Sequence, residues 1–101
     1  MPCLMLVYVR PDGQNREGLR TYTAEGLKIL KQYGGRHIVM GGNPQCLEGD
    51  FPWLLVVISE WPDREAALRF WNSPEYTAVK KHREGTGDYQ IVLVDSIPAP
   101  T

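Results

Sequence analysis

Three segments of this chain are apolar at consecutive positions rather than at every second position. They are Leu4–Val9, Trp53–Ile58 and Ile91–Val94. Successive side chains of a β-strand point to opposite faces of the sheet, so a strand with one wet face alternates apolar and polar residues. A continuous apolar run is typical of a strand that is covered on both faces. The sequence therefore predicts a sheet that needs a cover on each side.

Further strands and helices can be placed around these segments. We predict strands over 3–10, 36–40, 53–61 and 88–95, and the second of these can resume at 45–47. Apolar residues at helical spacing predict a helix over 16–33, and the glycine pair that follows is a typical helix end. The chain thus begins with the order strand, helix, strand, strand.

A second helix begins after Asp63, a typical N-cap residue, and is interrupted at 72–76. Ser73 then caps a restart with proline at the first helical position, and the helix continues through Arg83. The complete order is that of the ferredoxin-like α+β fold, a four-stranded antiparallel sheet with two helices on one face. The length of 101 residues predicts one such domain, 1–101, with residues 97–101 as a tail.

The second face of this sheet has no cover within the chain. Two helices cover one face only, and a chain of 101 residues has no further element to spare. We therefore predict a homodimer in which two sheets pack face to face at roughly 10 Å. Each chain would bury about 800 Å², the usual share of a stable interface.

Composition and charge argue against several classes of partner. Eleven basic and twelve acidic residues give a net charge of -1, which lacks the positive field that nucleic acid or an anionic membrane requires. No apolar run approaches the roughly 18 residues of a membrane span, and the N-terminus lacks the features of a signal peptide. Cys3 and Cys46 form no metal-binding or disulfide pattern. We expect a cytoplasmic protein with reduced thiols, no metal and no cofactor.

The chain resembles a known family in four motifs, YGGR at 33–36, LEGD at 47–50, EWP at 60–62 and WNSPEY at 71–76. This family is the one described as domain of unknown function 1330. The resemblance implies a dimeric α+β barrel, in which two ferredoxin-like sheets share a barrel and each subunit has a pocket between its helices and its sheet. The barrel superfamily includes cofactor-free monooxygenases, muconolactone isomerase-like enzymes, haem-degrading enzymes and proteins without known chemistry.

Two departures from these relatives bear on the chemistry. Members of the family often carry a basic residue near the start of the third strand, where this chain has Leu54 and Leu55. Haem-degrading relatives combine an asparagine, a tryptophan and a helical histidine. Here the first strand has no asparagine, and Asn72 lies on a helix, so Trp61 and His82 do not rebuild that set.

Arg36 and His37 follow a glycine pair, where missing side chains leave room for a ligand. The planar guanidinium of Arg36 suits a carboxylate or an enolate, and the alternative is an ion pair with Glu48 or Asp50. Because strand neighbours face opposite sides, only one of Arg36 and His37 faces the pocket. His37 and His82 are candidate proton shuttles, or else surface or capping histidines.

The WNSPEY segment supplies further candidates. Asn72, Ser73 and Tyr76 lie where the helix break exposes N–H groups suited to an anion. Alternatively, Ser73 only caps a helix and Tyr76 packs in the core; as a site residue, Tyr76 would donate a hydrogen bond or move a proton. Tyr22, on the apolar stripe of the first helix, either places its hydroxyl in the same pocket or packs in the core. Trp71 either lines the pocket for a flat ligand or packs in the core or the dimer interface.

Two classes of function fit these residues. The first is a dimeric protein that binds a small hydrophobic or oxygenated molecule in the pocket between helices and sheet. The alternative is a cofactor-free oxidoreductase, monooxygenase or isomerase that acts on a small aromatic or enolisable substrate. A structural dimer module without a ligand is a third reading. The scarcity of converging titratable groups favours binding over catalysis, and the sequence leaves open whether the protein is an enzyme.

Overall fold

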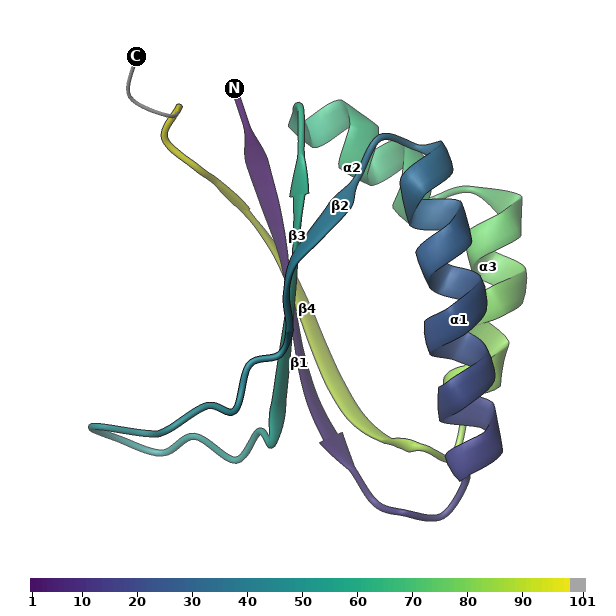
Figure 1. Ribbon diagram of the computed structural model, residues 1–101, viewed down its shortest axis with the longest axis vertical. Helices are drawn as coiled ribbons and strands as arrows, with labels where there is room; N and C mark the ends of the chain where they lie inside the picture. The colour runs from purple at the N-terminus through teal and green to yellow at the C-terminus, as the bar shows by residue number, and fades with distance from the viewer. Residues whose placement is uncertain (99–101) are drawn as a thin grey trace.

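The helices and strands follow the predicted order. The computed structural model describes residues 1–98, so the last part of the predicted tail, 99–101, lies outside the described residues. The elements are β1 (Cys3–Pro11), α1 (Arg16–Gln32), β2 (Arg36–Gly41), β3 (Leu55–Trp61), α2 (Arg64–Trp71), α3 (Pro74–Lys80), a 3-10 turn (Lys81–Arg83) and β4 (Gly87–Asp95). The strands pair antiparallel in the order β2-β3-β1-β4, and the helices lie on one side of the sheet (Figure 1). The predicted ferredoxin-like α+β fold is confirmed.

Side-chain caps set where the two short helices begin. Asp63 accepts a hydrogen bond from the backbone N–H of Ala66 at 2.8 Å. Ser73 accepts one from the backbone N–H of Tyr76 at 3.0 Å. Both residues are the predicted N-caps, and each satisfies a backbone donor that has no partner inside its helix. The interruption between α2 and α3 follows from the second cap, because Ser73 lies outside helical geometry.

The predicted continuation of the second strand at 45–47 is wrong. Gly42 and Asn43, which follow β2, have φ angles of 66° and 43°, in the left-handed region rather than the β region. The chain therefore leaves the sheet after Gly41. The resulting loop, 42–54, projects from the side of the sheet that faces away from the helices (Figure 1).

The face of the sheet beneath the helices carries the core. In β1, Cys3, Met5 and Val9 are buried under the helices, and Leu4 and Leu6 alternate with them on the other face. Trp61, at the end of β3, is only 1% exposed and packs against this same core. Both faces of β1 are thus apolar, as its consecutive apolar residues predict.

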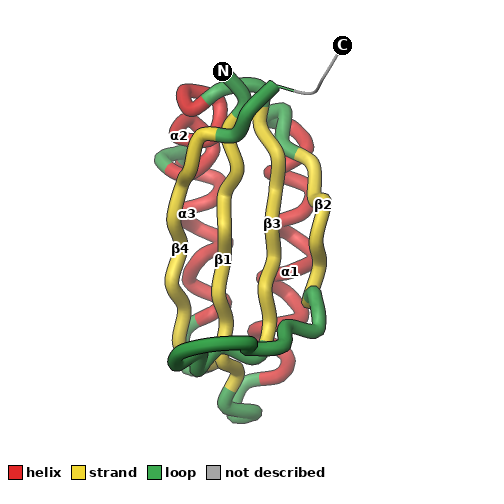
Figure 2. Tube along the Cα trace, turned by 90° about the vertical axis from the view of Figure 1, so that its left-hand side faces the viewer, coloured by secondary structure: helices red, strands yellow, loops and turns green. Residues whose placement is uncertain are grey.

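The opposite face, called the open face below, has no helix over it among residues 1–98 (Figure 2). Aliphatic side chains of all four strands point to it, namely Leu4, Leu6, Val39, Val56, Ile58, Val92 and Val94. At one end, Phe51 and Trp53 pack their rings against Tyr8, with centroids 5.9 and 6.2 Å apart. The strand β3 begins at Leu55, later than predicted, so Trp53 lies in the loop.

Candidate functional site

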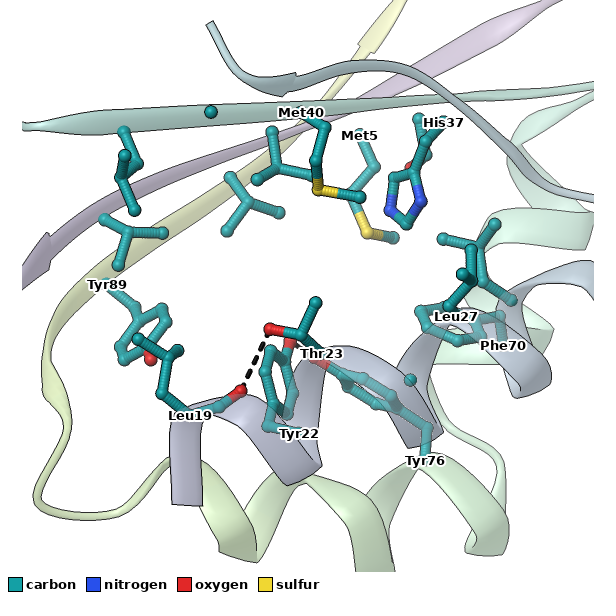
Figure 3. A pocket seen from close by; sticks show the side chains of 18 residues that line it. Met5, Leu19, Tyr22, Thr23, Leu27, His37, Met40, Phe70, Tyr76 and Tyr89 are labelled. Atoms are coloured by element: carbon teal, nitrogen blue, oxygen red, sulfur yellow. Dashed lines mark hydrogen bonds between the residues drawn. The ribbon is translucent and has the colours of Figure 1, made fainter. Parts of the chain in front are cut away.

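A cavity of about 240 Å³ lies between the sheet and helix α1 (Figure 3). Side chains of all four strands form one wall, and α1 forms the other with one ring from each of α2 and α3. The lining residues are Met5, Val7, Val9, Leu19, Tyr22, Thr23, Gly26, Leu27, Leu30, His37, Met40, Gly41, Leu55, Val57, Ser59, Phe70, Tyr76 and Tyr89. No carboxylate, lysine or arginine is among them, so the cavity suits an uncharged ligand.

Gly26 contributes to the open volume. It lies inside α1, lines the cavity, and a methyl group added there would meet no other atom within 4 Å. Glycine inside a helix is less favourable than alanine by about 0.5–1 kcal/mol. Gly26 therefore makes α1 less stable than alanine would, at a position where a side chain would reduce the cavity volume.

Two tyrosine hydroxyl groups meet on the helix side of the cavity. The hydroxyls of Tyr22, from α1, and Tyr76, from α3, share a hydrogen bond of 2.7 Å. Tyr76 is 3% exposed. Burial, followed by the nearby Tyr22, raises the pKa of Tyr76 above its usual range, so this hydroxyl keeps its proton at any physiological pH. The pair is a fixed hydrogen-bonding group in an apolar wall.

The guanidinium of Arg83 stands behind these rings. It lies 5.6 Å from the ring centroid of Tyr22 and 4.7 Å from that of Tyr89, within the range of cation–π attraction. Its Nη1 is buried and makes no hydrogen bond with any residue of 1–98. The guanidinium also has no ion-pair partner in that part of the chain. Its positive charge therefore polarises the tyrosines at this end of the cavity.

His37 faces the cavity from the sheet. Its imidazole points inward from β2 (Figure 3), and its Nδ1 is buried with no hydrogen-bond partner in residues 1–98. Burial, followed by the positive charge of Lys31, lowers the pKa of His37 below the ordinary 6.5. The imidazole is therefore neutral near physiological pH and can accept a proton or a hydrogen bond.

We expect stability to fall on mild acidification because of His37. Its pKa is lower in the folded chain than in the unfolded chain, so the unfolded chain binds more protons as the pH falls below about 6.5. The free energy of unfolding should drop from that pH down to the folded pKa and be insensitive to His37 above it. Urea unfolding across this window should show a shallower loss for His37→Gln, whereas the exposed control His82→Gln keeps the wild-type slope. Equal slopes for all three proteins would contradict this assignment.

Arg36 lies on the other side of the sheet from the cavity. Its guanidinium is exposed on the open face and pairs with Glu60 at 3.0 Å. An ion pair with Glu48 or Asp50 is not formed, because the strand register places Arg36 opposite Glu60. Of the two adjacent candidates, His37 is thus the one that lines the cavity, and Arg36 does not reach it.

The remaining candidates divide between the cavity and its surroundings. Tyr22 and Tyr76 line it, whereas Asn72, Ser73, Trp71 and His82 do not. Ser73 is occupied as a cap, and Asn72 is the exposed C-cap of α2. Trp71 packs against the ring of Tyr76, and the ammonium group of Lys80 lies over the Trp71 ring. His82 is exposed in the 3-10 turn.

The sequence analysis missed two residues that line the cavity, Tyr89 and Gly26, and one that packs on its tyrosines, Arg83. Tyr89 lies on the same face of β4 as two apolar residues at every second position, so the period of the strand could have placed it. Gly26 is a glycine inside a predicted helix, which is itself a signal of a packing requirement. Arg83 carries no local signal, because only the packing of the 3-10 turn against α1 brings it to the tyrosines.

Two further properties concern the described part of the chain. Within residues 1–98, no helix combines the length and the apolar character needed to cross a bilayer. The same residues contain no group of three or more histidine, cysteine and carboxylate side chains placed to hold a metal ion.

Comparison with known proteins gives a family and a set of similar folds. The model of the family described as domain of unknown function (DUF1330) matches residues 5–97. No curated protein is similar to this chain in sequence. A protein of unknown function from Rhodopseudomonas palustris has a TM-score of 0.80 at 23% identity, over 97% of this chain and 84% of that one.

Two other solved structures share the fold at lower identity. A mutant of SnoaB, a cofactor-independent oxygenase from Streptomyces nogalater, has a TM-score of 0.70 at 16% identity, over 97% of this chain and 95% of that one. A dimeric protein of unknown function with a ferredoxin-like fold, from Bacteroides fragilis, has a TM-score of 0.57 at 17% identity, over 94% and 95% of the two chains. At these identities the likeness establishes the fold alone.

Proposed function

The chain belongs to the family of domain of unknown function DUF1330, and we propose that it is a homodimeric protein that binds a small hydrophobic, oxygen-bearing molecule in the cavity beneath α1. The cavity itself carries this proposal. A cavity of about 150 Å³ lined by aliphatic and aromatic side chains is large enough to bind benzene. The volume of about 240 Å³ found here therefore accommodates a substituted benzene ring.

The homodimer rests on the open face. Seven aliphatic side chains gather there, and an exposed apolar patch of this kind marks an interaction surface. The ion pairs Arg10–Asp88 and Arg36–Glu60 lie toward opposite ends of the strands, which leaves the middle apolar inside a polar rim. The related fold from Bacteroides fragilis is described as dimeric. A second copy has the same face to offer, so sheet-to-sheet packing covers both.

Location in the cytoplasm forms part of the proposal. It is supported by two free thiols, Cys3 in the core and Cys46 in the exposed loop. Reduced thiols are usual for proteins of that compartment.

Filling the cavity from Gly26 tests the binding proposal. Para-ethylphenol, a small aromatic alcohol, should raise the melting temperature of the wild type and bind in calorimetry. Gly26→Leu adds a Cβ where no atom lies within 4 Å, and the rest of the side chain takes up volume beside the cavity. Binding should fall by at least about tenfold, and circular dichroism checks that the fold is kept. Gly26→Ala is the matched control. It should be more stable than the wild type by about 0.5–1 kcal/mol, with most of the binding kept.

Two outcomes would contradict the binding proposal. Wild-type protein that neither binds nor is stabilised by small aromatic compounds has no functional cavity of this kind. Undiminished binding by Gly26→Leu would place the ligand elsewhere on the protein.

A second candidate function is cofactor-free oxidation or isomerisation of the bound molecule. It is favoured by His37, a neutral base inside an apolar cavity, and by the fold shared with a cofactor-independent oxygenase. Oxygen uptake, or isomerisation of a compound that binds, would support catalysis if His37→Gln abolished it at concentrations of the compound that saturate the variant.

A further inference from the structure

The free hydrogen-bonding groups of the cavity restrict the ligand further. Several polar lining residues are already engaged. Thr23 donates to a backbone carbonyl one turn earlier in α1 at 2.9 Å, the dashed line in Figure 3. Ser59 accepts from the indole of Trp61 at 2.9 Å, and the hydroxyl of Tyr89 shares a hydrogen bond of 2.6 Å with Thr86. Thr23 has thus committed its proton, and the hydroxyls of Tyr89 and Thr86 bind one another. His37, the Tyr22–Tyr76 pair and the proton of Ser59 are left for a ligand.

The tyrosine pair has one proton to offer. Each hydroxyl carries one, and the hydrogen bond between Tyr22 and Tyr76 uses one of the two. Burial keeps Tyr76 protonated, and the unpaired charge of Arg83 lies against the Tyr22 ring. A donor backed by a positive charge binds best to an oxygen that carries partial negative charge. The helix wall is therefore suited to a carbonyl oxygen.

The sheet wall offers the complementary group. The neutral imidazole of His37 points into the cavity from the side opposite the tyrosine pair (Figure 3). A neutral imidazole accepts a hydrogen bond through its unprotonated nitrogen, so it is suited to a hydroxyl group. Between these polar groups the cavity is lined by apolar side chains, which include Met5, Val7 and Leu27.

We infer that the ligand is a flat, uncharged molecule with a carbonyl oxygen at one end and a hydroxyl at the other, such as a hydroxyaryl ketone. The carbonyl would meet the Tyr22–Tyr76 pair, the hydroxyl would meet His37, and the ring would fill the apolar middle. This inference rests on the proposed function, because it specifies the molecule that the same cavity takes.

Four probes of nearly equal size and shape separate the contributions of the two polar ends. Para-hydroxyacetophenone has both groups, para-methylacetophenone only the carbonyl, para-ethylphenol only the hydroxyl, and para-ethyltoluene neither. Titration calorimetry should show the first binding about fivefold more tightly than either single-group probe, which is the affinity gain that one buried hydrogen bond of about 1 kcal/mol provides. Para-ethyltoluene should bind most weakly.

Substitutions in the two walls of the cavity test which wall binds the carbonyl and which binds the hydroxyl. The double variant Tyr22→Phe/Tyr76→Phe removes both hydroxyls, because either one alone could still donate a proton. It should lose the preference for a carbonyl and keep the preference for a hydroxyl, whereas His37→Leu should do the reverse. Tyr33→Phe and His82→Leu are matched controls, because neither residue lines the cavity, and they should keep both preferences. Each preference is the ratio of two probe affinities measured in the same variant. Loss of the predicted preference alone supports the assignment.

The results of these titrations distinguish failure of this inference from failure of the proposed binding function. Equal binding of all four probes would overturn the inference and leave a cavity selective for hydrophobic molecules only. Preferences that survive in both Tyr22→Phe/Tyr76→Phe and His37→Leu would overturn it as well. Absence of binding by every probe would overturn the inference together with the proposed function.

Discussion

A Leu6→Glu variant is expected to sediment as a monomer under conditions in which the wild type is a dimer. Leu6 lies at the centre of the open face, where the register places it between Ile58 and Val92. Face-to-face packing of two sheets would bury one new carboxylate from each chain among aliphatic side chains. An unpaired buried ion costs several kcal/mol, and each 1.4 kcal/mol is a factor of ten, so the dissociation constant should rise by about a thousandfold or more.

The control for Leu6→Glu is the same substitution on the other side of the molecule. Leu68 is exposed on α2, away from the open face, so Leu68→Glu should leave the sedimentation of the dimer unchanged. Circular dichroism of both variants checks that each chain remains folded. A wild-type protein that is monomeric at micromolar concentration would overturn the dimer, and so would a Leu6→Glu variant that stays dimeric.

The parts of the fold that depend on local sequence are those that could be predicted. A helix or strand is specified by the period of its own apolar residues, and a cap by one side chain and the backbone N–H that it reaches. Asp63 and Ser73 are examples, because each cap forms within three residues of its own position. The apolar open face was also predictable, since a run such as Leu4–Val9 shows it directly.

The parts that depend on distant contacts could not be predicted in the same way. Arg36 pairs with Glu60, 24 residues away, because the β2–β3 register brings them together. The sequence showed that only one of Arg36 and His37 faces the cavity, but not which one. The cavity volume depends on how far α1 stands from the sheet, which no periodicity records. Arg83 reaches its site only through tertiary packing.

Trp61→Ala is expected to cause the largest loss of stability among single core substitutions. The ring of Trp61 is 1% exposed, lies 5.1 Å from the ring of Phe70, and leaves no room for a side chain at Gly35. Its Nε1 donates to Ser59 at 2.9 Å, so removing it also leaves a buried hydroxyl without that partner. Truncation of a buried tryptophan costs about 3–5 kcal/mol. That is a large part of the roughly 5–15 kcal/mol by which small domains are stable.

Trp71→Ala is the matched comparison for this substitution. Trp71 is half-buried and packs on Tyr76 at the edge of the core, so part of its surface is already in water. Its truncation leaves a smaller cavity and should cost clearly less. Urea unfolding of both variants measures the difference, with the proteins compared at the same concentration because dimerisation adds to apparent stability. Equal losses in the free energy of unfolding would mean that the buried ring and the half-buried ring contribute alike. That result would contradict the placement of Trp61 at the centre of the subunit core.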